Sequence, residues 1–384
     1  MNMQTEDNLH FSEPERIAWL TLKLIADLGN RSILRLVRHF GSPTAVLRAS
    51  AQDIDAVPGL RDKAKQALLR RNVIRAPRME WDCLKNEGIR MLCLGDPDYP
   101  VNLANIPDPP VALFVRGRIE PRDLVSIAIV GSRAASPMGM AFTEKLSMDL
   151  AQYGVTIVSG LAVGIDSAAH RGALKGNGRT LAVLGCGLDI EYPQVNSGLR
   201  KDIAASGALM TEFPLQTPPA PGHFPQRNRI ISGLALGVVV VEAAHRSGSL
   251  ITARMALEQG REVFAVPGIA RHYRSEGPHR LLKEGAKLVE SAEDVLEEIR
   301  PLIRPSWISD SGQERPMAPK PQLSRDEDLL LKSLDESPRH IDDICRSLSW
   351  PVAQVTASLL SLELKGIIKQ LPGMYFVHFR NGTC

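Results

Sequence analysis

The sequence predicts an α/β protein in which a doubly wound parallel sheet is flanked by an all-helical domain and a winged-helix domain. Three observations lead to this fold class. Between residues 119 and 300, short apolar runs alternate with stretches of helical periodicity, as expected for a parallel sheet covered by helices. Before this region, glycines separate short amphipathic segments. After it, three helical segments precede two short strands, which is the pattern of a winged helix.

Residues 1–77 are predicted to form the helical domain. A first helix is indicated by apolar residues that recur on one helix face before a stop at Gly29: Ile17, Leu20, Leu24 and Leu28. A second helix is expected over residues 33–40, with a stop at Gly41, and a third over residues 63–69, after the break at Pro58-Gly59.

Two turns of this domain, residues 25–29 and 57–60, resemble the hairpins of helix-hairpin-helix modules. Such hairpins present backbone N–H groups to DNA phosphates. A packing module that has the same turn is the alternative interpretation. The basic residues near the two turns are Arg31, Arg35, Arg38, Arg61, Lys63 and Lys65.

Residues 78–118 are predicted to connect this domain to the sheet and to add a strand or two to it, such as residues 113–115. Residues 119–300 are predicted to form the sheet domain, with strands over residues 126–131, 155–159, 180–184, 208–211, 237–242 and 262–266. Most of these strands are continuous runs of Val, Ile, Leu and Ala. Such runs are typical of strands that are covered on both faces.

Residues 301–322 contain five prolines and little that could form a core, so we predict a proline-rich linker. Residues 323–384 are predicted to form the winged helix, with helices from Asp326, over residues 340–348 and over residues 351–364. The third helix would normally enter the major groove, but it has no basic residue before Lys365. Phosphate contacts supply most of the affinity for duplex DNA, so contact with a protein is an equally open interpretation.

Composition limits the function classes. The chain has 384 residues and 46 basic against 43 acidic side chains, so any basic site must come from local clustering. Its five cysteines are widely spaced and form no CxxC motif, which indicates a reducing compartment and argues against disulfides or a cysteine zinc site. The first residues do not resemble a signal peptide, and no apolar run approaches 18 residues. We therefore expect a cytoplasmic protein without a membrane partner.

Glycines at the ends of two predicted strands indicate an anion site. The first strand runs into Gly131-Ser132-Arg133 and the second into Ser159-Gly160, each before a helix. A helix N-terminus offers free N–H groups and a favourable dipole to an anion, and an arginine adds a fork that suits phosphate. Such turns at one sheet edge converge on the crevice where doubly wound folds bind ligands. A tight turn with a solvated arginine is the alternative.

Asp166 and His170 lie four residues apart on the next predicted helix and could pair on one face. An acid–base or metal role is possible for such a pair. A helix-terminal aspartate and a structural histidine are the alternative, which we favour.

The segment from His223 to Gly233 is the most informative one. It contains an exposed aromatic residue, Phe224, followed by Arg227, Asn228 and Arg229. Arginines that hold phosphate beside an aromatic ring that stacks on a base are what single-stranded nucleic acid requires.

A further strand leads through Glu242 to Arg246-Ser247-Gly248-Ser249 and a helix. The two serines could cap this helix or bind phosphate. Glu242 could act as a general base or could hold Arg227 or Arg229 in place, and we favour the structural role.

These motifs identify a resemblance to the DNA-processing protein A (DprA/Smf) family. The matching runs are IAIVGSRAASPMG, VSGLAVGIDSAAHRGAL, LAVLGCGLDIEYPQVN, FPQRNRIISGLALGVVVVEAAHRSGSLITARMALEQGREVFAVPG and GPHRLLKEGA, in the expected order between Ile127 and Ala286. The resemblance implies an extended Rossmann-like fold with a SAM-like helical domain before it and a winged helix after it. It also implies single-stranded DNA binding in a basic pocket, dimerisation, and loading of the RecA recombinase on incoming DNA in natural transformation.

Carried over to this chain, the family motifs point to Arg133 as a phosphate ligand and to Phe224, Arg227 and Arg229. Family members often have a lysine where this chain has Pro221, so pocket charge could come instead from Lys175 or Arg246. The residues predicted to bind DNA are Gly131, Ser132, Arg133, Ser159, Gly160, Phe224, Arg227, Asn228, Arg229, Arg246, Ser247, Gly248 and Ser249.

Two other functions remain open. Nucleotide phosphoribohydrolases have a related fold, and Glu242 and Glu258 would be their candidate carboxylates, although the glycine-rich run of those enzymes is missing here. A duplex-binding regulator would act through the winged helix. The sequence contains no Walker A, HExxH or GxSxG motif and no metal-ligand spacing. We therefore expect no cofactor, no metal and no catalytic residue.

Overall fold

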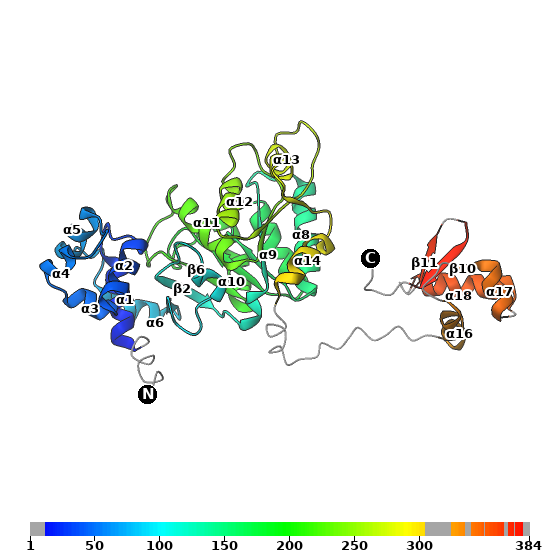
Figure 1. Ribbon diagram of the computed structural model, residues 1–384, viewed down its shortest axis with the longest axis horizontal. Helices are drawn as coiled ribbons and strands as arrows, with labels where there is room; N and C mark the ends of the chain where they lie inside the picture. Colours follow the sequence, from blue (N-terminus) through cyan, green and yellow to red (C-terminus); the bar gives the residue numbers. More distant parts are fainter. Residues whose placement is uncertain are drawn as a thin grey trace. The chain divides into compact units, whose positions relative to one another are not determined.

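The computed structural model describes residues 12–303, 324–334, 339–348, 350–364, 368–371 and 373–378 (Figure 1). The chain divides into two compact units, Met1–Asp310 and Ser311–Cys384. Each unit is described separately below. No helix in the described ranges is long and apolar enough to cross a membrane.

A nine-stranded sheet forms the centre of the first unit, in the order β1-β2-β6-β5-β4-β3-β7-β8-β9. From β6 to β9 all neighbours are parallel, whereas β1 and β2 pair antiparallel at one edge. The strands are β1 (Arg90–Cys93), β2 (Ala112–Gly117), β3 (Ser126–Val130), β4 (Thr156–Ser159), β5 (Thr180–Val183), β6 (Ala208–Thr211), β7 (Gly237–Val240), β8 (Glu262–Ala265) and β9 (Lys287–Leu288).

This sheet confirms the predicted doubly wound fold, and the six predicted central strands are present within two residues at either end. The edge strands β1 and β9 were not located. β9 has two residues, and β1 has only three apolar residues after an arginine, in the segment expected to connect the domains. Strands β3 and β7 are neighbours, and the chain moves away from this pair in opposite directions along the sheet. The pair is therefore the switch point at which such sheets bind ligands.

Helices cover both faces of the sheet because side chains alternate along each strand. Ile127 and Ile129 of β3 pack in one apolar cluster with α8, α9 and α14, while Ala128 and Val130 pack in another with α11 and α12. The helices are α7 (Val101–Ala104), α8 (Pro137–Gln152), α9 (Ile165–Lys175), α10 (Ser197–Ser206), α11 (His223–Leu234), α12 (Gly248–Glu258), α13 (Glu276–Lys283) and α14 (Ala292–Ile299), with 3₁₀ turns at Pro121–Leu124, Gln194–Asn196 and Arg300–Leu302.

From residue 12 onward, six helices precede the sheet: α1 (Glu13–Leu24), α2 (Asn30–Phe40), α3 (Pro43–Arg48), α4 (Ala51–Asp55), α5 (Asp62–Arg70) and α6 (Pro77–Asn86). The predicted stop at Gly41 is confirmed, since Gly41 caps α2 in the left-handed conformation. The predicted extension of α1 to Leu28 is wrong. Ile25 is extended and forms an isolated β-bridge with Val73. Leu28 lies in the turn after the helix, and its side chain is buried there. Apolar spacing alone therefore could not locate the end of α1.

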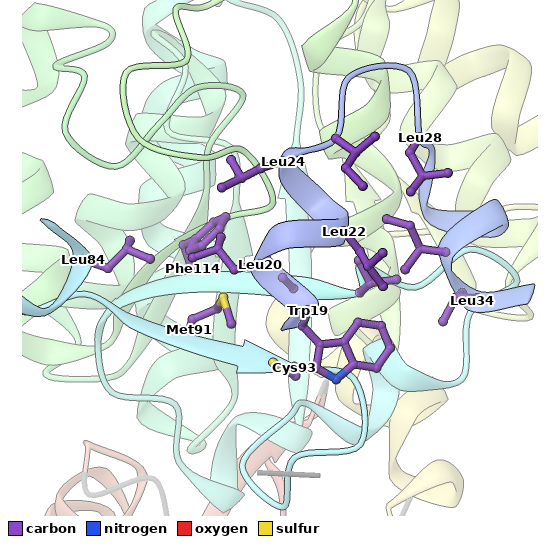
Figure 2. Close-up of a cluster of buried hydrophobic side chains, with 14 of the residues drawn as sticks. Trp19, Leu20, Leu22, Leu24, Leu28, Leu34, Leu84, Met91, Cys93 and Phe114 are labelled. Carbon is purple, nitrogen blue, oxygen red and sulfur yellow. The ribbon is translucent and has the colours of Figure 1, made fainter. Parts of the chain in front are cut away.

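The helices before the sheet share a core with it. Figure 2 shows Trp19, Leu20, Leu22 and Leu24 of α1 among side chains of β1, β2, α2 and α6. This apolar cluster extends from Trp19 through Phe114 of β2 to Leu215. A domain boundary near residue 77 stays a prediction, but the hydrophobic cluster is continuous across that position.

Basic side chains near the two hairpin-like turns are partly engaged within the helical module. Arg35 Nη1 donates to the carbonyl of Gly59, and Lys63 pairs with Asp27 at 2.9 Å. Gly59 has φ +65°, which is the left-handed conformation that such a tight turn requires.

The second unit is a winged helix in its described residues. Helices α16 (Arg325–Ser333), α17 (Ile341–Leu348) and α18 (Val352–Leu364) pack around Leu330, Ile344 and Val355. A three-stranded sheet, β10-β12-β11, consists of β10 (Arg339–His340), β11 (Ile368–Leu371) and β12 (Tyr375–His378). The predicted helices and the two strands of the wing are confirmed, and β10 is additional. Most of the predicted linker, residues 304–322, lies outside the described residues.

Candidate nucleic-acid interface

A cavity of about 790 Å³ opens at the carboxyl ends of β3 and β7, at the switch point of the sheet. The turns after β3, β4 and β7 line it together with the first residues of α11 and α12. The structure brings these predicted residues together in its lining: Gly131, Ser132, Arg133, Phe224, Arg227, Asn228, Arg246, Ser247, Gly248 and Ser249. The predicted residues Ser159, Gly160 and Arg229 lie outside this lining.

The turn after β3 is shaped by close approach to α9. A Cβ atom on Gly131 would lie 2.6 Å from a side-chain carbon of Ile165, so only glycine fits there. The carbonyl of Ser132 accepts a hydrogen bond from the N–H of Ile165 at 3.2 Å. Gly164, which caps α9, has φ +86°. The turn is thereby fixed with Arg133 exposed at the cavity.

Arg133 forms no ion pair in the part of the chain that the structure describes. Its guanidinium lies 4.9 Å from the centre of the Phe224 ring, a cation–π contact. An exposed guanidinium without a carboxylate partner keeps its donors available to a phosphate.

Phe224, which the sequence predicted to be exposed, is half-buried at the start of α11 because other rings and backbone pack against it. One neighbour is the ring of Tyr192, at 5.9 Å between ring centres, and another is the backbone of Gly185, where a Cβ atom would lie 3.0 Å from the phenyl ring. The ring is thus positioned by Arg133, Tyr192 and Gly185 beside the cavity. Tyr192 also lines the cavity but was not predicted.

Arg227 differs from Arg133 in being buried, with 4% of its surface exposed. Its Nη1 donates to the carbonyl of Gly160 at 2.7 Å and to the carbonyl of Val183, and its Nε donates to Asn228 at 3.1 Å. A Cβ atom on Gly160 would lie 2.3 Å from Arg227 Nη1. Gly160 therefore makes room for Arg227, and Arg227 joins α11 to the ends of β4 and β5.

Asp166 lies buried in the cavity lining near this guanidinium. Burial raises the pKa of the Asp166 carboxyl, and the positive charge of Arg227 opposes that rise. Burial likewise lowers the pKa of Arg227, while Asp166 opposes that fall. Each group therefore favours the charged form of the other, while burial of both acts more strongly in the opposite direction.

Arg229 faces away from the cavity. Its Nη2 donates to buried Glu212 at 2.7 Å, and its Nε lies 3.4 Å from Asp108. Lys23 and Asn30, from the first two helices, contact the same Glu212 oxygen. Burial alone would raise the pKa of Glu212, but Lys23 and Arg229 outweigh it, and the pKa is lowered. This network gives Arg229 a structural role and joins α11 to the N-terminal helices.

The turn before α12 presents a second set of polar groups. Ser247 caps the helix by accepting from the N–H of Ser249 at 3.4 Å, and the two hydroxyls lie 2.8 Å apart. Arg246 is exposed at the cavity and has no ion pair among the described residues. The N-terminus of α12 and Arg246 therefore add positive potential to the same wall.

Two further predictions concern pocket charge and the strand ends. Pro221 lines the cavity and is exposed, so it supplies no charge. Lys175 is at the other end of α9 and pairs with Glu144, so of these two residues only Arg246 adds charge to the cavity. Ser159 is buried, and its hydroxyl donates to the carbonyl of Ile129 at 2.6 Å, a structural role.

The possible pairing of Asp166 with His170 is not formed. His170 is fully buried, and its Nδ1 lies 2.6 Å from the hydroxyl of Thr180 on β5. Burial lowers the pKa of His170 to about 3 from 6.5. This histidine is a neutral structural residue at physiological pH.

Because His170 is buried in its neutral form, we expect the folded protein to lose stability at acid pH. The unfolded chain binds a proton at His170 below about pH 6.5, whereas the folded chain does not until about pH 3, so stability is lost as the pH falls between these values. The expected slope from this residue is about 1.4 kcal/mol per pH unit. Urea unfolding at several pH values should show a shallower slope for His170→Gln. Replacing the exposed His245 by glutamine is the control, and equal slopes in the two variants would contradict the assignment.

The two glutamates of the enzyme alternative do not line the cavity. Glu242 accepts from the N–H and hydroxyl of Ser136 at 2.9 and 2.5 Å, at the start of α8, so the suggestion that it holds Arg227 or Arg229 is wrong. Glu258 is exposed at the last residue of α12, at the end opposite the cavity. The described residues contain no group of three metal-ligating side chains.

Comparison with known proteins identifies the family of this chain. The family model described as DNA recombination-mediator protein A matches residues 90–300, and a DprA winged-helix model matches residues 314–374. The chain belongs to the DprA/Smf family. Its sequence is 45% identical to Protein Smf of Escherichia coli over 72% of this chain and 74% of the relative. It is 34% identical to Protein Smf of Synechocystis over 94% and 98%, respectively.

Solved DprA structures have the same fold. The X-ray structure of DprA from Streptococcus pneumoniae matches with a TM-score of 0.63 and 38% identity, over 75% of this chain and 98% of that one. DprA from Helicobacter pylori, whose structure concerns its single-stranded DNA binding mode, matches with a TM-score of 0.51 and 28% identity, over 56% and 97%.

Proposed function

We propose that this DprA/Smf family member binds single-stranded DNA, with little dependence on sequence, in the cavity at the switch point of its sheet. The arrangement that carries the proposal is Arg133 beside Phe224: an unpaired, exposed guanidinium next to an aromatic ring at one cavity wall. Phosphate and base are the two features common to every nucleotide, and these two side chains match them.

The rest of the wall supports the same ligand. Arg246 and the N-termini of α11 and α12 face the cavity, and each favours an anion. The H. pylori relative, described by its single-stranded DNA binding mode, has the same fold. None of these contacts reads a base edge, which is consistent with binding that tolerates sequence.

We propose further that the protein acts by binding and not by catalysis. Among the described residues, the cavity lining contains one carboxylate, Asp166, which is buried near Arg227. Glu242 is committed to capping α8. A nucleotide-release assay separates the alternatives: turnover that is lost in Glu242→Gln or Glu258→Gln would favour a phosphoribohydrolase.

Loading of RecA, a homodimer, a role in natural transformation and a cytoplasmic location belong to the same proposal. They rest on the family resemblance. RecA filament assembly on protein-coated single strands, with and without this protein, tests the first of them. Sedimentation of the full chain tests the second.

The test of the central proposal is a titration with single- and double-stranded oligonucleotides of equal length at several salt concentrations. We expect preference for the single strand and an affinity that falls steeply as salt rises, because counterions are released from the phosphates. Equal or stronger duplex binding would shift the function to the hairpin-like turns or the winged helix. Absence of binding at low salt would refute the proposal.

A further inference from the structure

An aromatic and basic loop lies next to the proposed DNA cavity but outside its lining. The loop consists of residues 267–275, between β8 and α13, with the sequence PGIARHYRS. It carries two arginines and a histidine and no acidic residue. Tyr273, near its end, is 51% exposed, and Ile269 is 73% exposed.

The loop is attached at two points to the segments that build the cavity. Arg274 Nε donates to the carbonyl of Ala134 at 2.9 Å, and Ala134 directly follows Arg133. The carbonyl of Arg274 accepts from the N–H of Ala243 at 2.8 Å, in the turn that leads from β7 to Arg246. Tyr273 is therefore held next to both arginine-bearing turns of the cavity.

The orientation of Tyr273 is set by its neighbours. The guanidinium of Arg274 lies 4.8 Å from the centre of the tyrosine ring, and the ring of His272 lies at 4.8 Å with a tilt of 30°. Arg274 itself is kept in place by Ala134 and by Glu242 at 3.8 Å. In the described residues, the Tyr273 hydroxyl has no hydrogen-bond partner, so the ring is positioned by these contacts with Arg274 and His272.

We propose that this loop is a second contact for single-stranded DNA, in which a base that follows or precedes the nucleotide in the cavity stacks on Tyr273 and its flanking phosphate meets Arg271. Half-exposed aromatic rings beside arginines are the elements of a sequence-tolerant stacking platform. Arg271 is exposed and has no ion pair among the described residues. Two acidic residues adjoin the loop: Glu242, which is engaged by Ser136 and Arg274, and Glu276 at the start of α13.

This inference rests on the proposed function, and it predicts that the effect of the loop on affinity depends on the length of the DNA strand. A very short strand fills the cavity alone, whereas a longer strand also reaches the loop. Removing the Tyr273 ring should therefore weaken the binding of long strands and leave the binding of short strands unchanged. The expected loss is at least about fivefold in affinity, the lower end of the effect of deleting one stacked base contact.

The experiment compares Tyr273→Ala, Tyr273→Phe and the unmodified full chain for binding to oligo(dT) of about 4 and about 20 nucleotides, lengths that bracket a typical single-strand site. Tyr273→Phe should bind like the unmodified protein, because stacking needs the ring and not the hydroxyl. Tyr153→Ala is the matched control, since Tyr153 is 61% exposed at the far end of α8.

The outcomes separate the two proposals. If the unmodified chain binds neither oligonucleotide, the proposed function itself fails. If it binds both and Tyr273→Ala binds the long strand as tightly as Tyr153→Ala does, only the loop assignment is overturned. An equal loss for short and long strands would also overturn it, because Tyr273 would then belong to the cavity.

Discussion

Replacing Arg227 by methionine should lower the free energy of unfolding by about 2–6 kcal/mol. The estimate follows from the two buried carbonyls, of Gly160 and Val183, that lose their donor, at about 1–3 kcal/mol for each unsatisfied group. Asp166 would also lose the charge that balances its own. Urea unfolding at neutral pH measures the change, and an unfolding midpoint equal to that of the unmodified protein would show that Arg227 is not a structural residue.

Arg133→Met is the matched control, because both arginines line the same cavity but only Arg227 is buried. We expect Arg133→Met to change stability by less than about 0.5 kcal/mol, as for other exposed positions. Its effect should appear in DNA binding instead, as a weaker affinity and a salt dependence flatter by about one phosphate contact. Adding Asp166→Asn to Arg227→Met should restore part of the lost stability, since it removes the unbalanced carboxylate.

Replacing Phe224 by alanine should weaken single-stranded DNA binding about 5- to 150-fold, which corresponds to about 1–3 kcal/mol for one stacked base. The ring lies against Arg133 and Tyr192, so its removal takes away a stacking surface and the contact that positions Arg133. Titration with oligo(dT) at fixed salt measures the loss.

Phe224→Leu separates stacking from packing. Leucine keeps most of the apolar volume against Gly185 but has no aromatic face. If Phe224→Leu binds as the unmodified protein does, the ring serves only to fill space. If Phe224→Tyr retains affinity while Phe224→Leu loses it, stacking is established.

Much of the sheet could be predicted from the sequence because a strand that is buried on both faces is a continuous run of apolar residues. The residues of β3 are all apolar except Ser126, and all are buried. The glycine turns after β3 and β4 were visible for a related reason: a close approach such as that of Gly131 to Ile165 excludes every larger residue. A position that requires glycine is visible in the sequence even when the residue packed against it is not known.

The roles of the two helix-borne arginines could not be predicted in this way. Arg227 and Arg229 are two residues apart, so they point to opposite sides of α11, about 200° apart. Which side faces the sheet edge depends on Gly160 and Glu212, which are distant in sequence. Tyr192 was missed for the same reason. It lies in the run LAVLGCGLDIEYPQVN that carries the family resemblance, but its contact with Phe224 joins a loop after β5 to α11 and leaves no local pattern.

The prediction of a helical module at the N-terminus was right about its class, but it placed three of the helices, extended the first one too far and did not address their attachment to the sheet. Trp19 and its neighbours pack on β1 and β2, and Lys23 reaches Glu212 at the end of β6. These are contacts between segments that lie about 70 to 190 residues apart, and the local periodicity of α1 gives no sign of them.

The carboxylate of Glu212 couples the stability of the N-terminal helices to that of the sheet domain. A fluctuation that lifts α1 or α2 from the sheet would strip Lys23 and Asn30 from a buried charge, so local opening there is as costly as breaking an interior ion pair. Because Arg229 holds the same carboxylate, α11 is anchored by helices that precede it by nearly 200 residues. The rigidity of α11, which lines the cavity, is thus supplied in part by two helices that are synthesised well before it.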